Sequence, residues 1–407
     1  MRTHAWLRTA TEIINRYSGS EPLNVFLRKF FAADKKFGST DRRNISQLCY
    51  SFYRLGRSFP AASIAERIVK GLFLVSASPN DMLASFSDEF NQRAAMSIAG
   101  KIEWLNEPLF YEQFLSFDAP LSEGVDMRAY AGSFFIQPQL FLRLRPGHEI
   151  TAPQKLEAAQ ITFQKKTGSC VELAIGSKIE AVLGIDREVV VQDYSSQRIR
   201  EVFESIPGFD SDGVKVWDAC AGSGGKSLLF FDLNPAAELT VSDIRSSILA
   251  NLRKRFSAAG IDRFKGFVTD LAAGQTDDSR ADAGTKPGLP LGKNSPAPRK
   301  KFDIIICDAP CTGSGTWART PEQLYFFDKS SIAGYVARQR AILQHLARHL
   351  KPGGHLVYIT CSVFFNENEA NCEFIGGQAG LQQKQQWLLT GYHDRADTLF
   401  AALFEQL

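Results

Sequence analysis

A strand–turn–helix pattern that repeats from residue 214 onward most constrains the fold of this chain. Short apolar runs with the composition of buried strands lie near 214–217, 239–243, 267–270, 302–307, 356–360 and 398–403. Longer segments with helical periodicity separate them, notably 244–258 and 331–350. This alternation predicts an α/β fold, a doubly wound and mostly parallel sheet. Such sheets bind their ligands at the carboxyl ends of the strands.

The residues before this repeat divide into two regions of different character. Residues 1–125 show helical periodicity, which predicts an all-helical N-terminal domain. Residues 130–210 alternate short β-rich runs, at 134–136 and 171–174, with a helical stretch at 152–165. We therefore expect a small α+β subdomain between the helical domain and the sheet.

The third expected domain spans residues 211–407 and contains the repeat itself. Residues 272–300 interrupt it with a mixture rich in Gly, Pro, Ala, Asp and Lys that lacks aromatic residues. A segment of this composition cannot form a packed core, so we expect a flexible insertion on the surface.

The charge of the chain is unevenly distributed. The formal net charge is +3, yet residues 1–70 contain 13 Lys and Arg against 5 Asp and Glu. A basic module on a nearly neutral body favours a polyanionic partner, with nucleic acid as the first candidate. A solvated helical surface explains the same excess, and charge alone does not separate the two interpretations.

The cysteine count and the apolar runs bear on the compartment. Seven scattered cysteines, an odd number, favour free thiols in a reducing, cytoplasmic environment. No run of 18 apolar residues occurs, and the first residues read directly into a helix, so we expect neither export nor membrane spanning. We expect no metal, because Cys307 and Cys311 lack the paired spacing of zinc ligands.

Two cysteines fifty positions apart are the strongest chemical signal. Cys311 ends the tetrapeptide Asp-Ala-Pro-Cys that follows the apolar run 304–307, and Cys361 follows the run 356–359. Both thiols are therefore expected at the same carboxyl edge of the sheet. A free cysteine is usually a small buried hydrophobe, but two at one edge, with Asp308 nearby, indicate a thiol-dependent reaction.

A glycine-rich turn and three acids indicate a cofactor site at that edge. The turn closes the first strand after Asp218 and opens a helix, and Asp243 and Asp270 end the next two strands. Acids at successive strand ends suit a nucleoside with net positive charge, such as S-adenosyl-L-methionine, and would repel a pyrophosphate. Helix capping is the alternative for any one of these acids. The residues expected to bind the cofactor are Cys220, Ala221, Gly222, Ser223, Gly224, Gly225, Lys226, Asp243, Asp270 and Asp308.

Over about residues 130–407 the chain resembles the RNA 5-methylcytosine methyltransferases of the Sun/Fmu and NOP2/NSUN type. The motifs that support this are Asp218–Lys226 with Ser227, Asp308–Gly315 running on to Arg319-Thr320-Pro321-Glu322, Tyr358–Ser362 followed by Asn366-Glu367-Asn368-Glu369, Gln192–Ser196, and Ala396–Phe400. The stretch from Asp41 to Arg57 is similar to the NusB-like RNA-binding domain of bacterial ribosomal RNA members. One departure is Ser223, which stands where the family usually has proline.

The resemblance implies a Rossmann-like class I methyltransferase that uses S-adenosyl-L-methionine to methylate carbon 5 of cytosine in RNA. Ribosomal RNA of the small subunit is the expected substrate and a monomer the expected state. Transfer RNA, or a non-catalytic RNA-binding assembly factor, is the alternative. An exocyclic amino methyltransferase is disfavoured, because such enzymes carry Asn/Asp-Pro-Pro-aromatic in place of Asp-Ala-Pro-Cys.

The resemblance also assigns roles to the catalytic candidates. It places the nucleophile that adds to carbon 6 of cytosine at Cys361. Cys311 assists release of the product, Asp308 bonds and protonates the ring at N3, and Lys226 orients Asp308.

Overall fold

The computed structural model describes residues 2–34, 36–115, 119–273, 300–378 and 380–407, which form two compact units. Unit 1 comprises Met1–Ala119, Val125–Pro138 and Thr316–Lys329, and unit 2 comprises Pro120–Gly124, Gln139–Gly315 and Ser330–Leu407. Positions 274–299 of the expected insertion lie outside the described residues. No helix in the described part of the chain is long and apolar enough to cross a membrane.

Unit 1 consists of helices around an aromatic-rich core. They are α1 (Arg2–Arg16), α2 (Leu23–Ala33), α3 (Ser39–Tyr53), α4 (Ile64–Val75), α5 (Asp81–Ala84), α6 (Asp88–Gln92), α7 (Ile98–Trp104), α8 (Phe110–Phe114), α9 (Met127–Ser133) and α14 (Pro321–Phe326). A capping box of Ser63 and Glu66 begins α4 by satisfying backbone N–H groups of its first turn. Leu48, Phe52 and Leu72 are among the fully buried core residues.

One expectation about unit 1 was wrong, and a segment that lies far away in the sequence groups with this unit. Residues 134–136, expected as a strand, continue from α9 as turns, and Phe134 is buried against the ring of Phe114. Residues 316–329, expected within the domain 211–407, belong to unit 1, where Glu322 accepts a hydrogen bond from the Leu23 backbone N at 3.1 Å. Aromatic contacts place both segments: Phe134 contacts Phe114, and Tyr325 contacts Phe52 and Tyr53.

Unit 2 contains a small antiparallel sheet in the order β2-β3-β1-β4 within the described residues. Its elements are β1 (Leu140–Leu144), α10 (Thr151–Ala158), β2 (Phe163–Thr167), β3 (Cys170–Leu173) and β4 (Val189–Val191). The helix expected over 152–165 is too long, because Gln160 takes a left-handed φ of 57° and the Ile161 N–H bonds back to Leu156.

The main sheet of unit 2 has seven strands in the described residues, in the order β10-β11-β9-β8-β5-β6-β7. Its elements are α11 (Tyr194–Glu204), β5 (Lys215–Asp218), α12 (Gly225–Leu233), β6 (Glu238–Asp243), α13 (Ser246–Ala258), β7 (Phe264–Val268), β8 (Phe302–Asp308), α15 (Ser330–Ala347), β9 (Leu350–Thr360), α16 (Glu369–Gln378), β10 (Leu381–Thr390) and β11 (Thr398–Gln406), with 3-10 turns η1 (Ser314–Thr316), η2 (Phe365–Glu367) and η3 (Gly391–Asp394). Strands β5 to β9 pair in parallel and β10 and β11 are antiparallel. The strand order reverses at β5, where β6 lies on one side and β8 on the other, which is where such sheets bind ligands.

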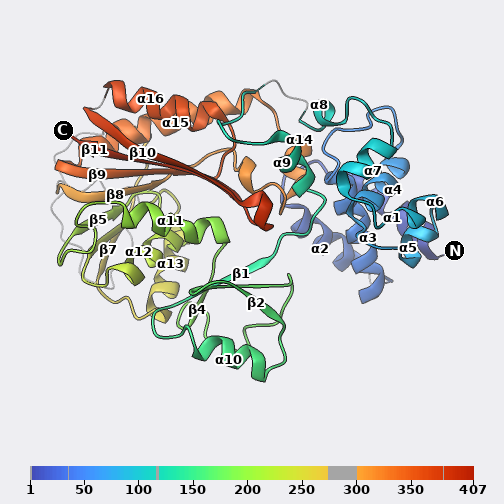
Figure 1. The fold of residues 1–407 in the computed structure, drawn as a ribbon, viewed down its shortest axis with the longest axis horizontal. Coiled ribbons are helices and arrows are strands. Elements are labelled where there is room, and N and C mark those ends of the chain that lie inside the picture. The colour runs from blue at the N-terminus through green and yellow to red at the C-terminus, as the bar shows by residue number, and fades with distance from the viewer. Residues whose placement is uncertain (1, 35, 116–118, 274–299, 379) are drawn as a thin grey trace. The chain divides into compact units, whose positions relative to one another are not determined.

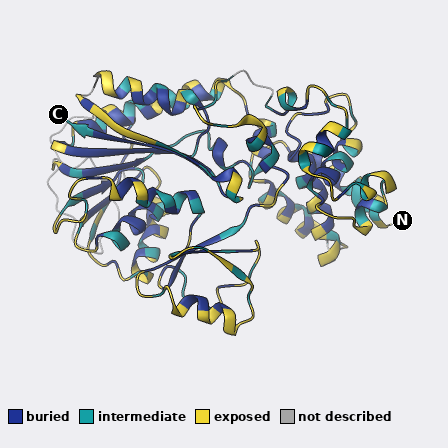
Figure 2. Ribbon diagram, in the orientation of Figure 1, coloured by how far each residue is buried: buried dark blue, intermediate teal, exposed yellow. Residues whose placement is uncertain are grey.

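Helices cover both faces of this sheet (Figure 1). One core packs α11, α12 and α13 on one face, and the other packs α15 and α16 on the opposite face. The central strands are buried along their length (Figure 2), as their apolar runs predict, whereas the edge strand β10 leaves most of its polar side chains exposed.

Asp218 ends β5 as a fully buried carboxylate, and burial raises its pKa to about 7. Ser227 Oγ donates to its Oδ2 at 2.5 Å, and Oδ1 has no hydrogen-bond partner in the described residues. Between the unfolded pKa near 4 and this value the folded protein holds a proton that the unfolded chain has lost. Stability from Asp218 is therefore lost as the pH rises through that window.

We predict that D218N removes this pH dependence. From pH 5 to pH 8 the wild type should lose on the order of 2 kcal/mol of stability relative to D218N, measured by denaturant unfolding. D303N is the control, because the Lys351 ion pair outweighs burial and lowers the pKa of Asp303. The difference in free energy of unfolding between D303N and wild type should stay constant over the same pH range. If the free energies of unfolding of D218N and wild type change equally with pH, the assignment to Asp218 is contradicted.

Candidate functional site

The parallel pairing of β8 with β9 brings the two cysteines together. Asp308 pairs with Ile359, so the loops after the two strands leave the sheet side by side. The Cys311 and Cys361 Sγ atoms lie 3.3 Å apart. The Gly315 backbone N donates to the Cys361 carbonyl at 2.8 Å and fastens one loop to the other.

Lys226 and Asp308 form an ion pair at the same edge. Lys226 Nζ lies 3.2 Å from Asp308 Oδ2 and 2.9 Å from Ser196 Oγ, and its side chain is nearly buried. Burial by itself lowers the pKa of Lys226, but the Asp308 charge and hydrogen bond outweigh it and raise the pKa. The ammonium therefore stays charged and holds Asp308 in place.

The environment of Cys311 disfavours its thiolate. The hydrogen bond to Cys361, followed by burial and the charges of Cys361 and Glu367, raises the pKa of Cys311 well above its ordinary value. Cys311 therefore holds its proton more tightly than an ordinary thiol.

A cavity of about 390 Å³ opens beside this pair. Its lining includes Cys220, Asp243, Asp270, Asp308, Cys311 and Arg338. The cavity thus runs from the ends of β6 and β7 to the first of the two cysteines. Three carboxylates on its wall fit the nucleoside with net positive charge that the sequence predicts.

The strand-end acids hold different positions. Asp243 accepts a hydrogen bond from the Arg245 backbone N at 2.9 Å, and Asp270 accepts one from Ala272 N at 3.0 Å. Both therefore cap their own turns as well as lining the cavity. Asp218 is buried below the turn with Ser227 and is absent from the cavity wall, where Asp308 is the third acid.

The glycine turn contacts the cavity through Asp243. Cys220 lines the cavity, but residues 221–226 are not on its wall. The Gly222 backbone N donates to Asp243 Oδ2 at 3.0 Å. Gly224, at φ +84°, packs so closely on α13 that an added Cβ would lie 2.8 Å from Phe256 Cε1. The turn therefore fixes the position of an acid on the wall.

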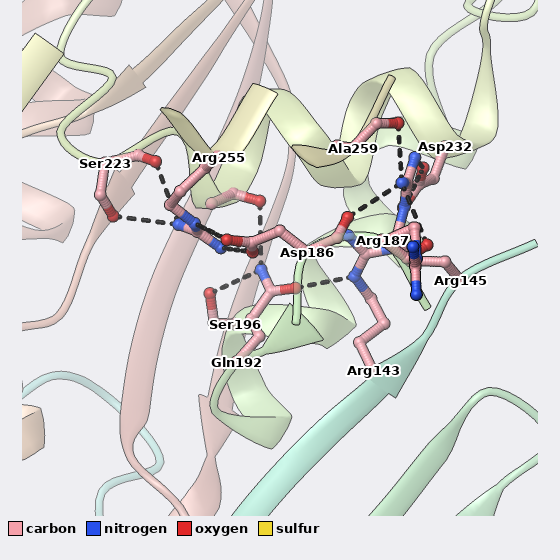
Figure 3. Close-up of polar contacts among 11 residues, drawn as sticks. Arg143, Arg145, Asp186, Arg187, Gln192, Ser196, Ser223, Asp232, Arg255 and Ala259 are labelled. Carbon is pink, nitrogen blue, oxygen red and sulfur yellow. Dashed lines mark hydrogen bonds and ion pairs between the residues drawn. The ribbon is translucent and has the colours of Figure 1, made fainter. Parts of the chain in front are cut away.

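Arg255 of α13 holds Ser223, the residue that replaces the family's usual proline (Figure 3). Its Nη1 donates to the Ser223 carbonyl at 3.0 Å and to Ser223 Oγ at 3.1 Å. Its Nε and Nη2 bond the Asp186 carboxylate at 2.8–3.0 Å. Asp186 takes a left-handed φ of 62°, a strained conformation for a non-glycine residue. Hydrogen bonds from the Arg255 side chain thus restrain the turn at Ser223, the position where a proline ring would otherwise restrain it.

A second part of this network joins the small sheet to α12 (Figure 3). Asp232, nearly buried, pairs with Arg143, which is also buried, and with Arg145 at 2.7 Å. Arg143 Nε also donates to Gln192 Oε1 at 2.8 Å, and Gln192 Nε2 donates to Ser196 Oγ at 3.2 Å. Since Ser196 contacts Lys226, these bonds extend to the cysteine edge.

Sequence reasoning missed three contributors to the site. Arg255 and Asp186 are separated by 69 positions and belong to no recognised motif. Glu367 lies in a motif, yet its partners are distant in the sequence: its carboxylate accepts bonds from Thr312 Oγ1 at 2.6 Å and Ser362 Oγ at 2.5 Å. An acid six residues after the cysteine that follows a buried strand is the signal that could have revealed it.

Curated relatives and a family model match the region that contains the site. Residues 205–394 match the family described as 16S rRNA methyltransferase RsmB/F. Ribosomal RNA small subunit methyltransferase B of Xylella fastidiosa is 30% identical over 237 residues, covering 58% of this chain and 50% of that protein. Its counterpart in Xanthomonas campestris is 29% identical over 186 residues, covering 46% and 37%. The chain thus spans half or less of these relatives' length.

Solved structures share the fold at lower identity. The crystal structure of PH0851 is 17% identical, with a TM-score of 0.63 and 98% of each chain covered. A methyltransferase homologue from Pyrococcus horikoshii is 19% identical, with a TM-score of 0.53 and coverage of 70% of this chain and 92% of that one. The expected Rossmann-like class I methyltransferase fold is confirmed. The region from residue 205 to residue 394, which contains the glycine turn and both cysteines, is similar to the RsmB/F family of 16S rRNA methyltransferases.

Proposed function

We propose that this protein is an S-adenosyl-L-methionine-dependent RNA cytosine-5 methyltransferase that acts on ribosomal RNA. The observation that carries the proposal is the pair of thiols 3.3 Å apart beside the Lys226–Asp308 ion pair, at the switch point of a methyltransferase sheet. An exocyclic amino methyltransferase has no use for two thiols at this position.

Carbon 5 of cytosine needs activation before it can accept a methyl group. Addition of the Cys361 thiolate to carbon 6, with protonation of N3, moves electron density onto carbon 5. Asp308 bonds N3 and the exocyclic amine and passes to N3 the proton that the Cys361 thiol loses, so that the addition balances. After methyl transfer the proton on carbon 5 leaves to a base, and the bond between sulfur and carbon 6 breaks.

The raised pKa of Cys311 supports a later role for this thiol. Cys311, whose pKa is raised, holds its proton more tightly than an ordinary thiol, which suits it less to the attack on carbon 6 than to a later step. The ammonium of Lys226 stabilises negative charge in its vicinity. Cys311 then serves the later step, the loss of the carbon 5 proton and release of Cys361.

S-adenosyl-L-methionine fits the cavity because carboxylates line it from the end of β6 to Asp308 and Cys311. The cofactor supplies the methyl group. Asp243 suits the ribose hydroxyls and Asp270 an adenine amino group. The glycine turn, which Arg255 holds through Ser223, keeps Asp243 in place for this contact by donating a hydrogen bond from the Gly222 backbone N.

RNA binding involves the regions before the methyltransferase sheet. The excess of Lys and Arg in residues 1–70 provides the charge for phosphate contacts, in keeping with a NusB-like domain. The target cytosine must leave its stack to reach the thiols, so a single-stranded or bulged site is expected.

We predict that C311A accumulates a covalent protein–RNA adduct, because the thiol that assists release is absent. The adduct should appear as a slow band on denaturing gels when C311A is incubated with S-adenosyl-L-methionine and 16S ribosomal RNA. C361A and C311A/C361A should give no such band. Persistence of the adduct in C361A would show that the nucleophile is another residue.

Bisulfite sequencing of total RNA from cells with and without the gene identifies the substrate. One ribosomal 5-methylcytosine should disappear in its absence. Loss of a transfer RNA position instead would move the activity to that substrate, and no change in any RNA would refute the methyltransferase.

We predict that R255A weakens cofactor binding, because Ser223 and the turn that fixes Asp243 lose their support. The Kd of S-adenosylhomocysteine in isothermal titration calorimetry should rise about threefold to tenfold. K254A is the control, since Lys254 is an exposed neighbour on the same helix. An unchanged Kd in R255A would show that the glycines hold the turn without this contact.

A further inference from the structure

Glu367 is a fully buried carboxylate that has no role in the proposed chemistry. It ends the 3-10 turn η2, six residues after Cys361. Among the described residues its carboxylate is bonded by neutral donors, and no Lys or Arg pairs with it. Burying a charge without a cation is costly. A structure that keeps such a group therefore depends on the bonds it makes.

Those bonds join the two cysteine loops, which are residues 309–315 after β8 and residues 361–364 after β9. Oε1 accepts from the Thr312 backbone N and from Gln339 Nε2, each at 3.0 Å. Oε2 accepts from Thr312 Oγ1 at 2.6 Å and from Ser362 Oγ at 2.5 Å. Thr312 directly follows one cysteine and Ser362 directly follows the other. One carboxylate thus holds the residue after each thiol.

The hydrogen bonds of Glu367 form a bridge between the two cysteine loops. This bridge is stronger than the other bonds between these loops. The Gly315–Cys361 backbone bond joins the same two segments, but both of its groups are neutral. Hydrogen bonds to an ionised carboxylate are shorter and about twice as strong as neutral ones. Glu367 is therefore the group best placed to set how far apart the loops stand.

We propose that Glu367 is a positioning residue that fixes the separation of the Cys311 and Cys361 sulfur atoms. Its importance for methyl transfer rests on the proposed function. A displacement of about 1 Å at a reacting centre can lower a rate about 10²-fold, so a group that sets this distance controls the rate without touching substrate.

The electrostatics agree with this geometry. The charge of Glu367 is among the causes that raise the pKa of Cys311, after the hydrogen bond to Cys361 and burial. The same carboxylate that spaces the thiols thus helps to keep the proton on Cys311.

The first test measures the distance between the thiols chemically, without RNA or cofactor. Diamide takes two electrons and two protons from a pair of nearby thiols, which become a disulfide. In the full-length wild type, Cys311 and Cys361 should form this disulfide rapidly, and mass spectrometry of alkylated peptides follows the reaction. The rate of this disulfide formation is the closure rate. E367Q keeps the shape of the side chain but loses the charge and replaces one of the two acceptor oxygens by an NH2 group, so closure should slow about tenfold or more.

The matched control is E369Q, which alters a buried glutamate two residues away. The Glu369 carboxylate accepts from Ser122 Oγ at 3.0 Å and from Glu123 N at 3.2 Å and contacts neither cysteine loop. Its closure rate should match the wild type. Closure of E367Q at the wild-type rate would overturn the proposal.

T312V provides a second route if E367Q fails to fold, which its thermal midpoint would reveal. It removes the Thr312 hydroxyl and leaves the carboxylate, so closure should slow by a smaller factor. If T312V closes at the wild-type rate, the bridge does not set the distance.

Kinetics distinguish failure of this proposal from failure of the proposed function. With RNA methylation as the assay, E367Q should lower kcat about 10²-fold while the KM for RNA and for cofactor stays within about twofold. A wild type that methylates no RNA would refute the activity but leave the closure assay as a test of the bridge. A loss of kcat/KM that comes only from a higher KM would assign Glu367 to substrate binding and reject its positioning role.

Discussion

The parallel pairing of β8 with β9 is the constraint on which the site depends. Its register sets Ile306 opposite Val357 and Asp308 opposite Ile359, so both chains leave the sheet at one edge. A slip by one residue would turn every buried side chain of a strand to the other face of the sheet. Because both faces are covered by helices and both strands are buried, the apolar cores on each side lock this register.

The last strand supports the same edge from the other side. β11 pairs with β9 in the antiparallel sense, with Phe400 opposite Thr360. Its first residue, Thr398, lies so close to the loop after β8 that a Cβ on Gly315 would be 2.0 Å from the Thr398 carbonyl oxygen. Only glycine fits there, and its N–H is then free to bond the Cys361 carbonyl. The C-terminal strand thus helps to shape a loop about eighty residues earlier.

The sequence predicts those parts of the fold and site that follow from local pattern. Strands β5, β8 and β9 are continuous apolar runs bounded by turn residues, so their ends, and the shared edge of Cys311 and Cys361, could be anticipated. Strand β10 was missed because its Gln-rich residues are exposed at a sheet edge and show no apolar alternation.

What the pattern could not reveal depends on distant contacts. Residues 134–136 have strand-like composition, but Phe134 and Phe135 are buried by aromatic packing. The support of Ser223 comes from Arg255 and, behind it, Asp186, and neither position has a local signature. The motif around Glu367 was visible, yet its function follows from Thr312, 55 positions earlier, which only the fold brings near.

The two buried charges beside the thiols are stabilised in different ways, and this difference follows from their tasks. Lys226 is paired with Asp308, whose side chain remains 35% exposed and lines the cavity, so the pair can respond to charge on a bound ligand. Glu367 is bonded by neutral donors and shielded from solvent, so nothing that binds in the cavity neutralises it. A carboxylate in that setting gains its stabilisation from four donors that must all stay in place, which makes the surrounding loops rigid. One charge is therefore suited to the reaction and the other to holding the sulfur atoms still while it proceeds.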